Sequence, residues 1–316
     1  MTVGGADASY VAGMVAPAPP AVSLIASPTK RTAILDLATE LDARGFSGLA
    51  CPSLGSALSL CVSIAHVTHS IRFWTSIQPI YFSHPSETAG TAAHLHEVSG
   101  GRFSLGLGVS HGPVHDRLGV GVGKPLADTR AYVEGVRAAA RGVGELPPII
   151  LATLRDKMLA LALEVSEGAV WANASRSAMA DQLGRVVPAD RRGSFFLGNM
   201  IPTVIDEDRA AARNVHRKTL TGYVSLPNYR NYWKAAGYED EMTAIEAAIA
   251  AGERDKLPGL MTDAWVDDCT LSGSATQVRD GVEAWREAGI TTPILVMSST
   301  TGGQVKAINQ LMEAYA

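Results

Sequence analysis

The chain has 316 residues, of which 47% are hydrophobic, and its formal net charge is −4. This length permits a large core, and a charge so near balance, without blocks of Lys and Arg, argues against nucleic acid or an anionic membrane as a partner. The three cysteines form no C-x-x-C pair, and their odd number is typical of the reducing cytosol. We therefore expect a soluble, cytoplasmic protein without a nucleic acid or membrane partner.

No targeting segment is evident near the first residue. The apolar run over residues 11–25 is interrupted by three prolines, which would break a membrane-spanning helix. Residues 1–10 contain no Lys or Arg, whereas a signal peptide begins with a basic region. We interpret residues 1–20 as an Ala/Pro-rich N-terminal arm and residues 21–316 as a single domain.

From Ala21 onward, short apolar stretches alternate with stretches of helical spacing. Pro85 suits the first turn of a helix, and Asp206 and Ser274 suit helix caps. The pattern predicts strands over residues 22–26, 47–51, 71–78, 102–108, 148–152, 169–172, 195–201 and 293–297. It predicts helices over residues 32–44, 58–68, 85–98, 126–141, 156–166, 176–183, 206–236, 242–251 and 275–288.

Eight strands alternating with helices indicate an α/β fold of the (β/α)8, or TIM barrel, type. The irregular stretch over residues 237–269 lies between the seventh strand and the helix expected at 275–288, which we count as the eighth. We predict that this insertion packs outside the barrel and covers its active face. In such a barrel the functional residues lie in the strand-to-helix loops at one end.

The most informative segment runs from Ser99 to Gly112. It reads as a turn, then a buried parallel strand over residues 102–108, then a loop that holds His111. Gly106 and Gly108 have no side chain, so a flat or phosphorylated ligand could approach the backbone there. The loop is therefore a candidate binding site.

Two other loops have the composition of anion sites. Residues 173–176 open a helix after the sixth strand, where backbone N–H groups, hydroxyls and the Arg176 guanidinium could converge on a phosphate. Residues 298–303 follow the eighth strand, where many barrels bind phosphate. Ordinary helix capping explains the same residue types, so both interpretations stay open.

His111 could donate or accept a proton beside a bound ring, because the pKa of histidine lies near physiological pH. The alternative is a surface loop histidine without a role. His111, His115 and Asp116 resemble a metal cluster by composition, but Pro113 lies among them and no third strand-end ligand is evident. We expect no metal. Tyrosines and tryptophans over residues 223–238 could clamp an aromatic substrate or serve helix packing.

Other barrel chemistries fit the strand ends poorly. A Schiff-base aldolase needs a lysine at a strand end, and none of the lysines ends a predicted strand. A zinc amidohydrolase needs His-x-His on the first strand, which has no histidine. The glycines from Gly106 to Gly112 match a dinucleotide fingerprint only loosely, because they follow the fourth strand and Pro113 intrudes.

Several segments in the same order resemble the bacterial luciferase-like superfamily of (β/α)8 oxidoreductases, which use FMN or the deazaflavin coenzyme F420. The block around Arg102 is the most specific of them. The matching segments are residues 40–49 (ELDARGFSGL), 75–85 (TSIQPIYFSHP), 97–108 (EVSGGRFSLGLG), 148–158 (PIILATLRDKM), 167–171 (EGAVW), 273–278 (GSATQV) and 288–295 (AGITTPIL).

The resemblance implies a cofactor site at the strand ends. It implies a non-proline cis peptide bond in a bulge of the third strand, two loops that line the flavin ring and ribityl chain, and one loop that binds the phosphate. The bulge residues are Ser76 and Ile77, the lining residues are Val109, Ser110, His111, Ala152, Thr153 and Leu154, and the phosphate residues are Asn173, Ala174, Ser175 and Arg176.

Two positions depart from the family pattern. The second-strand loop at residues 52–55 lacks the acid, His or Trp often found in relatives, and His111 stands where some deazaflavin-dependent relatives have a glutamate proton donor. The function implied by the resemblance is hydride transfer between F420 and a small organic substrate, by a homodimer or higher oligomer. Alternatives are an FMN-dependent monooxygenase using O₂, a catalytically silent flavin-binding protein, and a phosphosugar-binding barrel without redox chemistry.

Overall fold

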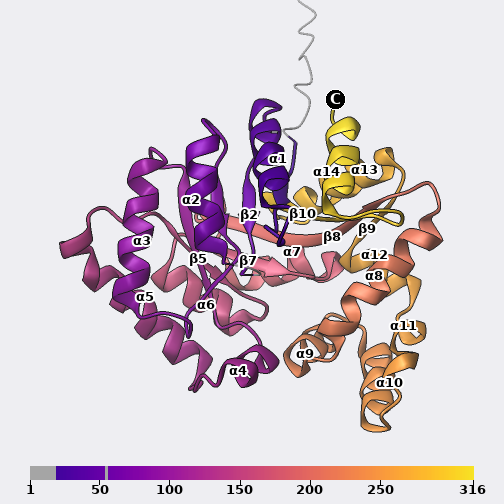
Figure 1. Cartoon of the computed structure of the whole chain (residues 1–316). Coiled ribbons are helices and arrows are strands. Elements are labelled where there is room, and N and C mark those ends of the chain that lie inside the picture. The colour runs from indigo at the N-terminus through magenta and orange to yellow at the C-terminus, as the bar shows by residue number, and fades with distance from the viewer. Residues whose placement is uncertain (1–18, 54–55) are drawn as a thin grey trace, which may run out of the picture.

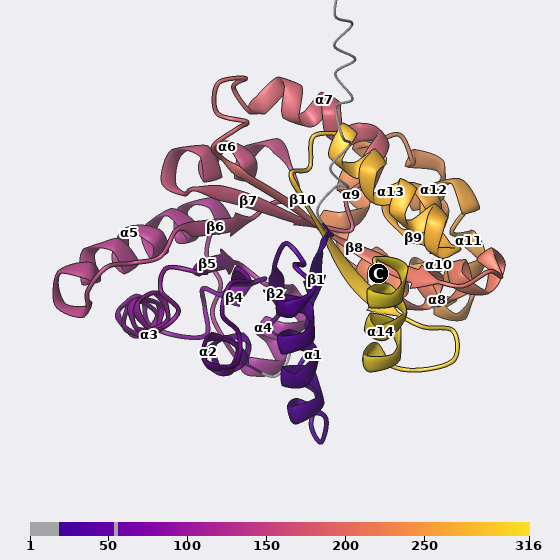
Figure 2. The same ribbon diagram turned by 90° about the horizontal axis from the view of Figure 1, so that it is seen from above.

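The computed structural model describes residues 19–53 and 56–316, and eight parallel strands form a closed barrel within these ranges (Figures 1 and 2). The last strand closes the barrel because it pairs with both the first strand and the seventh. The predicted (β/α)8 architecture is therefore confirmed. The barrel strands are β1 (Ala21–Ser23), β2 (Leu49–Cys51), β3 (Phe73–Thr75), β5 (Phe103–Gly108), β6 (Ile149–Ala152), β7 (Gly168–Ala172), β8 (Phe196–Ile205) and β10 (Thr292–Ser298).

Helices surround the barrel (Figure 2). Their amphipathic sequences bury one face against the strands, and Ser274 begins one of them with the predicted cap, a reciprocal capping box with Gln277. The surrounding helices are α1 (Arg31–Ala43), α2 (Ala57–Val67), α3 (Pro85–Val98), α5 (Pro125–Val143), α6 (Asp156–Val165), α7 (Arg176–Val186), α13 (Ala275–Glu287) and α14 (Gln304–Ala314). Helix α13 is thus the seventh barrel helix, and α14, which the sequence prediction lacks, is the eighth.

The strand predicted over residues 71–78 is divided in two. Strand β3 ends at Thr75, and a two-residue strand, β4 (Gln78–Pro79), continues beside β5. Trp74 pairs with Ser104 but Gln78 pairs with Leu107, so the third strand has one extra residue relative to β5. This extra residue is the bulge that the resemblance implied.

The predicted helix over residues 206–236 is also divided. It consists of α8 (Arg209–Val224) and α9 (Pro227–Ala235), and the break falls where Pro227 has no N–H to continue the first helix. The cap of α8 is Asp208, whose carboxylate accepts a hydrogen bond from the Ala211 amide, so the prediction of Asp206 as the cap was wrong.

The insertion lies between β8 and α13, as the sequence predicted. It contains α10 (Glu239–Ala250), the 3₁₀ turn η1 (Arg254–Lys256), α11 (Leu257–Leu260) and α12 (Asp263–Cys269), and it ends in a short strand, β9 (Leu271–Gly273), on the edge of β8. The short helix α4 (Gly112–Leu118), which the prediction lacked, follows β5. Figure 1 shows α4, α9 and α10 extending on the same side of the molecule.

The core has two parts. A large cluster lies between strands and helices, and a smaller one fills the barrel interior with Ala21, Ala50, Trp74, Ile150, Val170 and Ile294. No helix in the described ranges combines the length and apolar character needed to cross a membrane. Most of the predicted arm, residues 1–18, and Leu54–Gly55 of the second-strand loop lie outside the described residues.

Candidate functional site at the barrel mouth

The bulge places Ser76 and Ile77 at the carboxyl ends of the barrel strands, which we call the mouth. The bond between them is cis, as the resemblance implied. The Ser76 amide donates to the Cys51 carbonyl at 2.7 Å, and its hydroxyl donates to the Met200 thioether at 3.0 Å. Ile77 is half-buried. These contacts fix the bulge between β2 and β8.

Gly106 and Gly108 make room for protein groups, not for a ligand. A Cβ on Gly106 would lie 1.8 Å from the Thr75 carbonyl oxygen. A Cβ on Gly108 would lie 2.8 Å from the Ala152 Cβ and 2.9 Å from the Ile77 Cγ1. The expectation that these glycines let a ligand reach the backbone was therefore wrong. Because they have no side chain, the third-strand bulge can pack directly against the backbone of β5.

The three residues predicted at the end of β6 and in the loop after it, Ala152, Thr153 and Leu154, lie in different environments. Ala152 is half-buried against Gly108, and Leu154 is half-buried, with its carbonyl accepting from the Gln182 amide at 3.2 Å. Thr153 is buried, and its hydroxyl has no hydrogen-bond partner. Ala152 therefore lies beside Ile77 at the mouth.

His111 packs against aromatic residues of α8 and α9. Its ring lies 6.0 Å from the Tyr223 ring and 5.8 Å from the Tyr229 ring, centroid to centroid, both nearly edge-on. Burial lowers the pKa of His111, and the neighbouring His115 lowers this pKa further. His111 is therefore a packed, half-buried side chain and not a free surface histidine.

The loop that carries His111 is itself held by hydrogen bonds. Ser110 has a φ of 63°, in the left-handed region, and Val109 and Ser110 are half-buried. The His115 ring Nε2 lies 2.5 Å from the Val109 carbonyl oxygen, and Tyr81 packs edge-on against the His115 ring. Loop and bulge therefore form adjoining parts of one surface.

The aromatic residues over 223–238 form a wall beside His111. Tyr223 contacts Tyr229, Tyr229 contacts Trp233, and Trp233 contacts Trp265, with ring centroids 4.9–5.3 Å apart. Tyr229 and Trp233 are buried, whereas Tyr223 is half-buried. Helix packing thus explains the inner rings, and the half-buried Tyr223 lies against His111 at the outer end of the wall.

The loop at residues 173–176 is hydrogen-bonded to α9. Asn173, with a φ of 56°, accepts a hydrogen bond on its carbonyl from the Trp233 indole at 3.1 Å. The Ser175 amide donates to the Tyr232 hydroxyl at 3.0 Å, and Ala174 is buried. Only Arg176 of these four residues is exposed, and its side chain forms no ion pair within the described ranges. The predicted phosphate loop is therefore partly closed by protein.

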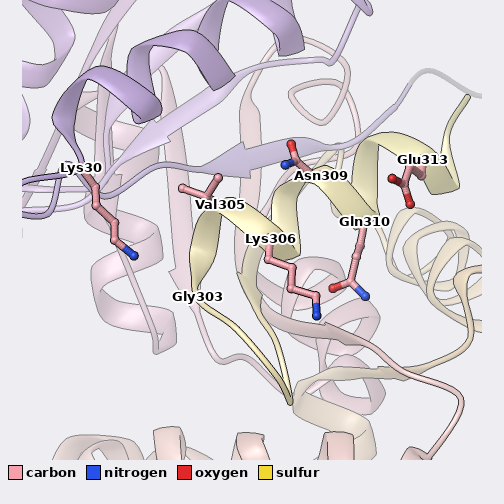
Figure 3. A pocket seen from close by; sticks show the side chains of 7 residues that line it. All are labelled: Lys30, Gly303, Val305, Lys306, Asn309, Gln310 and Glu313. Carbon is pink, nitrogen blue, oxygen red and sulfur yellow. The ribbon is translucent and has the colours of Figure 1, made fainter.

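The loop at residues 298–303 follows the carboxyl end of β10, and its polar side chains form local hydrogen bonds. Thr300 donates to Asp206, and the Lys306 ammonium donates to the Thr301 hydroxyl at 2.7 Å. A surface cavity of about 610 Å³ opens between α1 and α14, beside this loop (Figure 3). It is lined by Lys30, Gly303, Val305, Lys306, Asn309, Gln310 and Glu313. None of these residues belongs to the mouth positions described above.

Buried polar atoms without partners mark the mouth as fit for a ligand. The hydroxyls of Ser23 and Thr153 lie at the ends of β1 and β6 and have no hydrogen-bond partner, and the Asn173 side-chain amide, at the end of β7, lies beside the Tyr223 hydroxyl. Such groups cost free energy unless a ligand or water completes them. Apolar Ile77, Ala152 and Met200 beside them would suit a flat aromatic ring bearing polar edges.

Sequence reasoning missed Ser23 and Asp268, and it named Tyr232 only as part of the aromatic stretch over residues 223–238. Ser23 lies two residues after Ala21, so strand alternation places both in the barrel interior and could have found it. Tyr232 lies on α9 and Asp268 lies on α12 of the insertion, and no strand register defines the position of either helix. No cluster of His, Cys, Asp or Glu suited to a metal occurs in residues 19–53 and 56–316.

Comparisons with known proteins agree with this architecture. A family model described as luciferase-like monooxygenase matches residues 12–292. A Mycobacterium tuberculosis protein that carries the provisional name of coenzyme F420-dependent oxidoreductase is 26% identical over 293 residues, covering 78% of this chain and 84% of that protein.

Two solved structures share the fold. The F420-dependent tetrahydromethanopterin reductase of Methanopyrus kandleri superposes with a TM-score of 0.76 at 17% identity, over 94% of this chain and 98% of that one. The oxygenating constituent of 3,6-diketocamphane monooxygenase from Pseudomonas putida, in complex with FMN, gives 0.60 at 14% identity, over the same shares of the two chains. Because the family model covers most of its length, the chain belongs to the luciferase-like monooxygenase family of oxidoreductases.

Proposed function

We propose that the chain transfers a hydride between coenzyme F420, held across the barrel mouth, and a small organic substrate. One observation carries the proposal: half-buried apolar side chains lie at the mouth beside the unpartnered hydroxyls of Ser23 and Thr153. The M. tuberculosis relative favours F420 over FMN by its name. Membership of an oxidoreductase family supports the reaction type.

The deazaflavin, when bound, supplies the carbon that accepts or donates the hydride. Ile77, Ala152 and Met200 would exclude water from one face of the ring, since their side chains are apolar and half-buried. The Ser23 and Thr153 hydroxyls and the Asn173 amide would satisfy polar atoms of the cofactor. These residues supply orientation and a dry environment, which a hydride transfer needs.

His111 would hold the proton that accompanies the hydride. Its lowered pKa keeps the imidazole neutral near pH 7, so it is poised to accept a proton from a substrate hydroxyl as the hydride leaves. In the reverse direction the imidazolium returns that proton. The Tyr223 and Tyr229 rings pack against the His111 ring and limit its orientation.

Two other functions have specific support. An FMN-dependent monooxygenase is favoured by the shared fold with the camphane monooxygenase bound to FMN. A silent flavin-binding protein is favoured by the second-strand loop, where Pro52 and Ser53 offer no acid, His or Trp.

Anaerobic titration of the purified protein with F420 and with FMN tests the proposal, followed by turnover assays with a panel of alcohols and unsaturated compounds. We expect F420 to bind and its absorbance to bleach with at least one substrate. Product formation that needs reduced FMN and O₂ would identify the monooxygenase, and binding without any turnover the silent protein. Failure of both cofactors to bind would contradict all three functions.

A further inference from the structure

The N-terminus of α7, where the resemblance implied a phosphate, already holds a carboxylate from the insertion. The Ser177 amide donates to the Asp268 Oδ1 at 2.9 Å, and the Ser177 hydroxyl donates to Oδ2 at 2.7 Å. Asp268 is only 7% exposed and comes from α12. With Tyr232 accepting from the Ser175 amide, protein atoms occupy two amides that would otherwise face a ligand.

Asp268 changes the electrostatics of this helix end. The N-terminus of an α-helix attracts one anionic group, and here a side chain takes that place. A second anion nearby meets like-charge repulsion that burial strengthens, because the local dielectric constant is lower than that of water. The exposed guanidinium of Arg176, the residue that begins α7, is the one cation this loop offers a ligand.

The two candidate cofactors differ in the charge they bring to this position. FMN ends in a phosphate monoester, which carries close to two negative charges at neutral pH. In F420 the corresponding phosphate is a diester, which carries one. A loop with one cation and one resident carboxylate is better matched to the single charge.

We propose that Asp268 and Tyr232 make this loop discriminate against a phosphate monoester, so that the mouth takes the phosphodiester cofactor F420 in preference to FMN. The inference rests on the proposed function, because it names which cofactor the same mouth selects. It assigns a specificity role to Tyr232 of α9 and to Asp268 of the insertion.

Riboflavin and FMN test the inference, because they share a ring and differ only in the phosphate. The ratio of their dissociation constants isolates the contribution of the phosphate. Asp268→Asn removes the charge while retaining an oxygen that can accept from the Ser177 amide. Asp267→Asn is the matched control: it removes the same charge from the adjacent residue of α12, whose carboxylate pairs with Arg209 and Arg213.

We expect wild-type protein to bind FMN no tighter than riboflavin, within about threefold. In Asp268→Asn, FMN affinity rises about tenfold or more, equivalent to about 1.4 kcal/mol, while riboflavin affinity is unchanged. Asp267→Asn behaves as wild type. Tyr232→Phe frees the Ser175 amide without changing charge, so the affinity for FMN relative to riboflavin should rise by a smaller factor, about threefold. This variant replaces Asp268→Asn in the test if Asp268→Asn does not fold.

Two results would overturn this inference and leave the proposed function intact. One is wild-type protein that binds FMN more than about tenfold tighter than riboflavin. The other is a folded Asp268→Asn or Tyr232→Phe variant whose ratio stays at the wild-type value. If riboflavin, FMN and F420 all fail to bind the wild-type protein, the proposed function is contradicted and this inference falls with it.

Discussion

The indole N–H of Trp233 donates a hydrogen bond to the backbone carbonyl of Asn173, 3.1 Å away. This contact joins α9 to the loop after β7, at a residue held in the left-handed region. Helix α9 is therefore in contact with the mouth, and changes in its packing should reach the loop at residues 173–176.

Trp233→Phe tests that coupling. The variant leaves the buried Asn173 carbonyl without its donor, which costs about 1–3 kcal/mol of unfolding free energy. Trp171→Phe is the control, since the Trp171 indole N–H has no hydrogen-bond partner in the described structure. In urea titrations, we expect Trp233→Phe to cost about 1 kcal/mol more than Trp171→Phe. Equal losses would show that the hydrogen bond contributes nothing.

Gly108→Ala introduces a methyl group between Ile77 and Ala152, at distances that real Cβ contacts do not reach. Overpacking of this kind costs about 1–3 kcal/mol, and the displaced Ile77 should also weaken cofactor binding. Gly112→Ala, whose new Cβ meets nothing within 4 Å, should leave both stability and binding near wild type. A stable Gly108→Ala variant with normal affinity would show that the bulge tolerates displacement.

His111→Gln separates proton transfer from binding. We expect kcat to fall about 100-fold or more, as for loss of a general acid or base, while the dissociation constant of F420 changes little. The wild-type rate should decline as pH falls through the lowered pKa of His111, since the base becomes protonated, and the variant should lose that decline. An unchanged pH profile in the variant would assign the proton to another group.

Arg176→Ala should weaken F420 binding by about 1.5–3 kcal/mol, the range for a charge-assisted contact. Stability should stay within about 0.5 kcal/mol of wild type, because the side chain is exposed. Arg254→Ala, another exposed arginine on η1, should leave affinity unchanged. Calorimetric titration with F420 measures the affinity of both variants. Unaltered affinity in Arg176→Ala would show that the loop is an ordinary helix cap and does not bind the phosphate.

His216 should make stability depend on pH. Burial lowers its pKa to about 4 in the folded state, against about 6.5 when unfolded, and its ring lies 3.0 Å from the Leu271 carbonyl oxygen. Because the folded state favours the neutral ring, its contribution is complete above about pH 6.5 and is lost as pH falls toward 4. The loss approaches about 3 kcal/mol over that interval.

Urea titrations between about pH 7.5 and pH 5 compare wild type with His216→Gln. The variant should lose less stability on acidification, whereas His66→Gln, at an exposed position of α2, should follow wild type. Parallel curves for wild type and His216→Gln would show that His216 does not titrate in this range.

The barrel could be predicted from sequence because its strands are short apolar runs at regular intervals. The bulge could not, since an extra residue between Trp74 and Gln78 leaves the apolar pattern of residues 71–78 intact. The prediction of the bulge came only from the family resemblance. Helix α14 carries a usable signal that the prediction left out: Ala307, Ile308, Leu311 and Met312 recur at helical spacing.

The site was harder to predict than the fold. Strand-end residues such as Ala152 and Asn173 follow from the barrel geometry. The contact of Asp268 with Ser177 joins residues 91 apart through an insertion without strand register, so local pattern gives no sign of it. Gly106 and Gly108 of β5 show a second limit of prediction from sequence. Two glycines indicate that some group lies close to the backbone, but they do not indicate whether that group is a ligand or another part of the protein.

A crystal structure of the protein with F420 would show directly where the deazaflavin ring binds. We predict that the deazaflavin ring lies at the mouth against Ile77, Ala152 and Met200, with its phosphate beside Arg176. A ring bound instead in the cavity between α1 and α14, or a mouth filled by the protein's own side chains in the complex, would contradict the account.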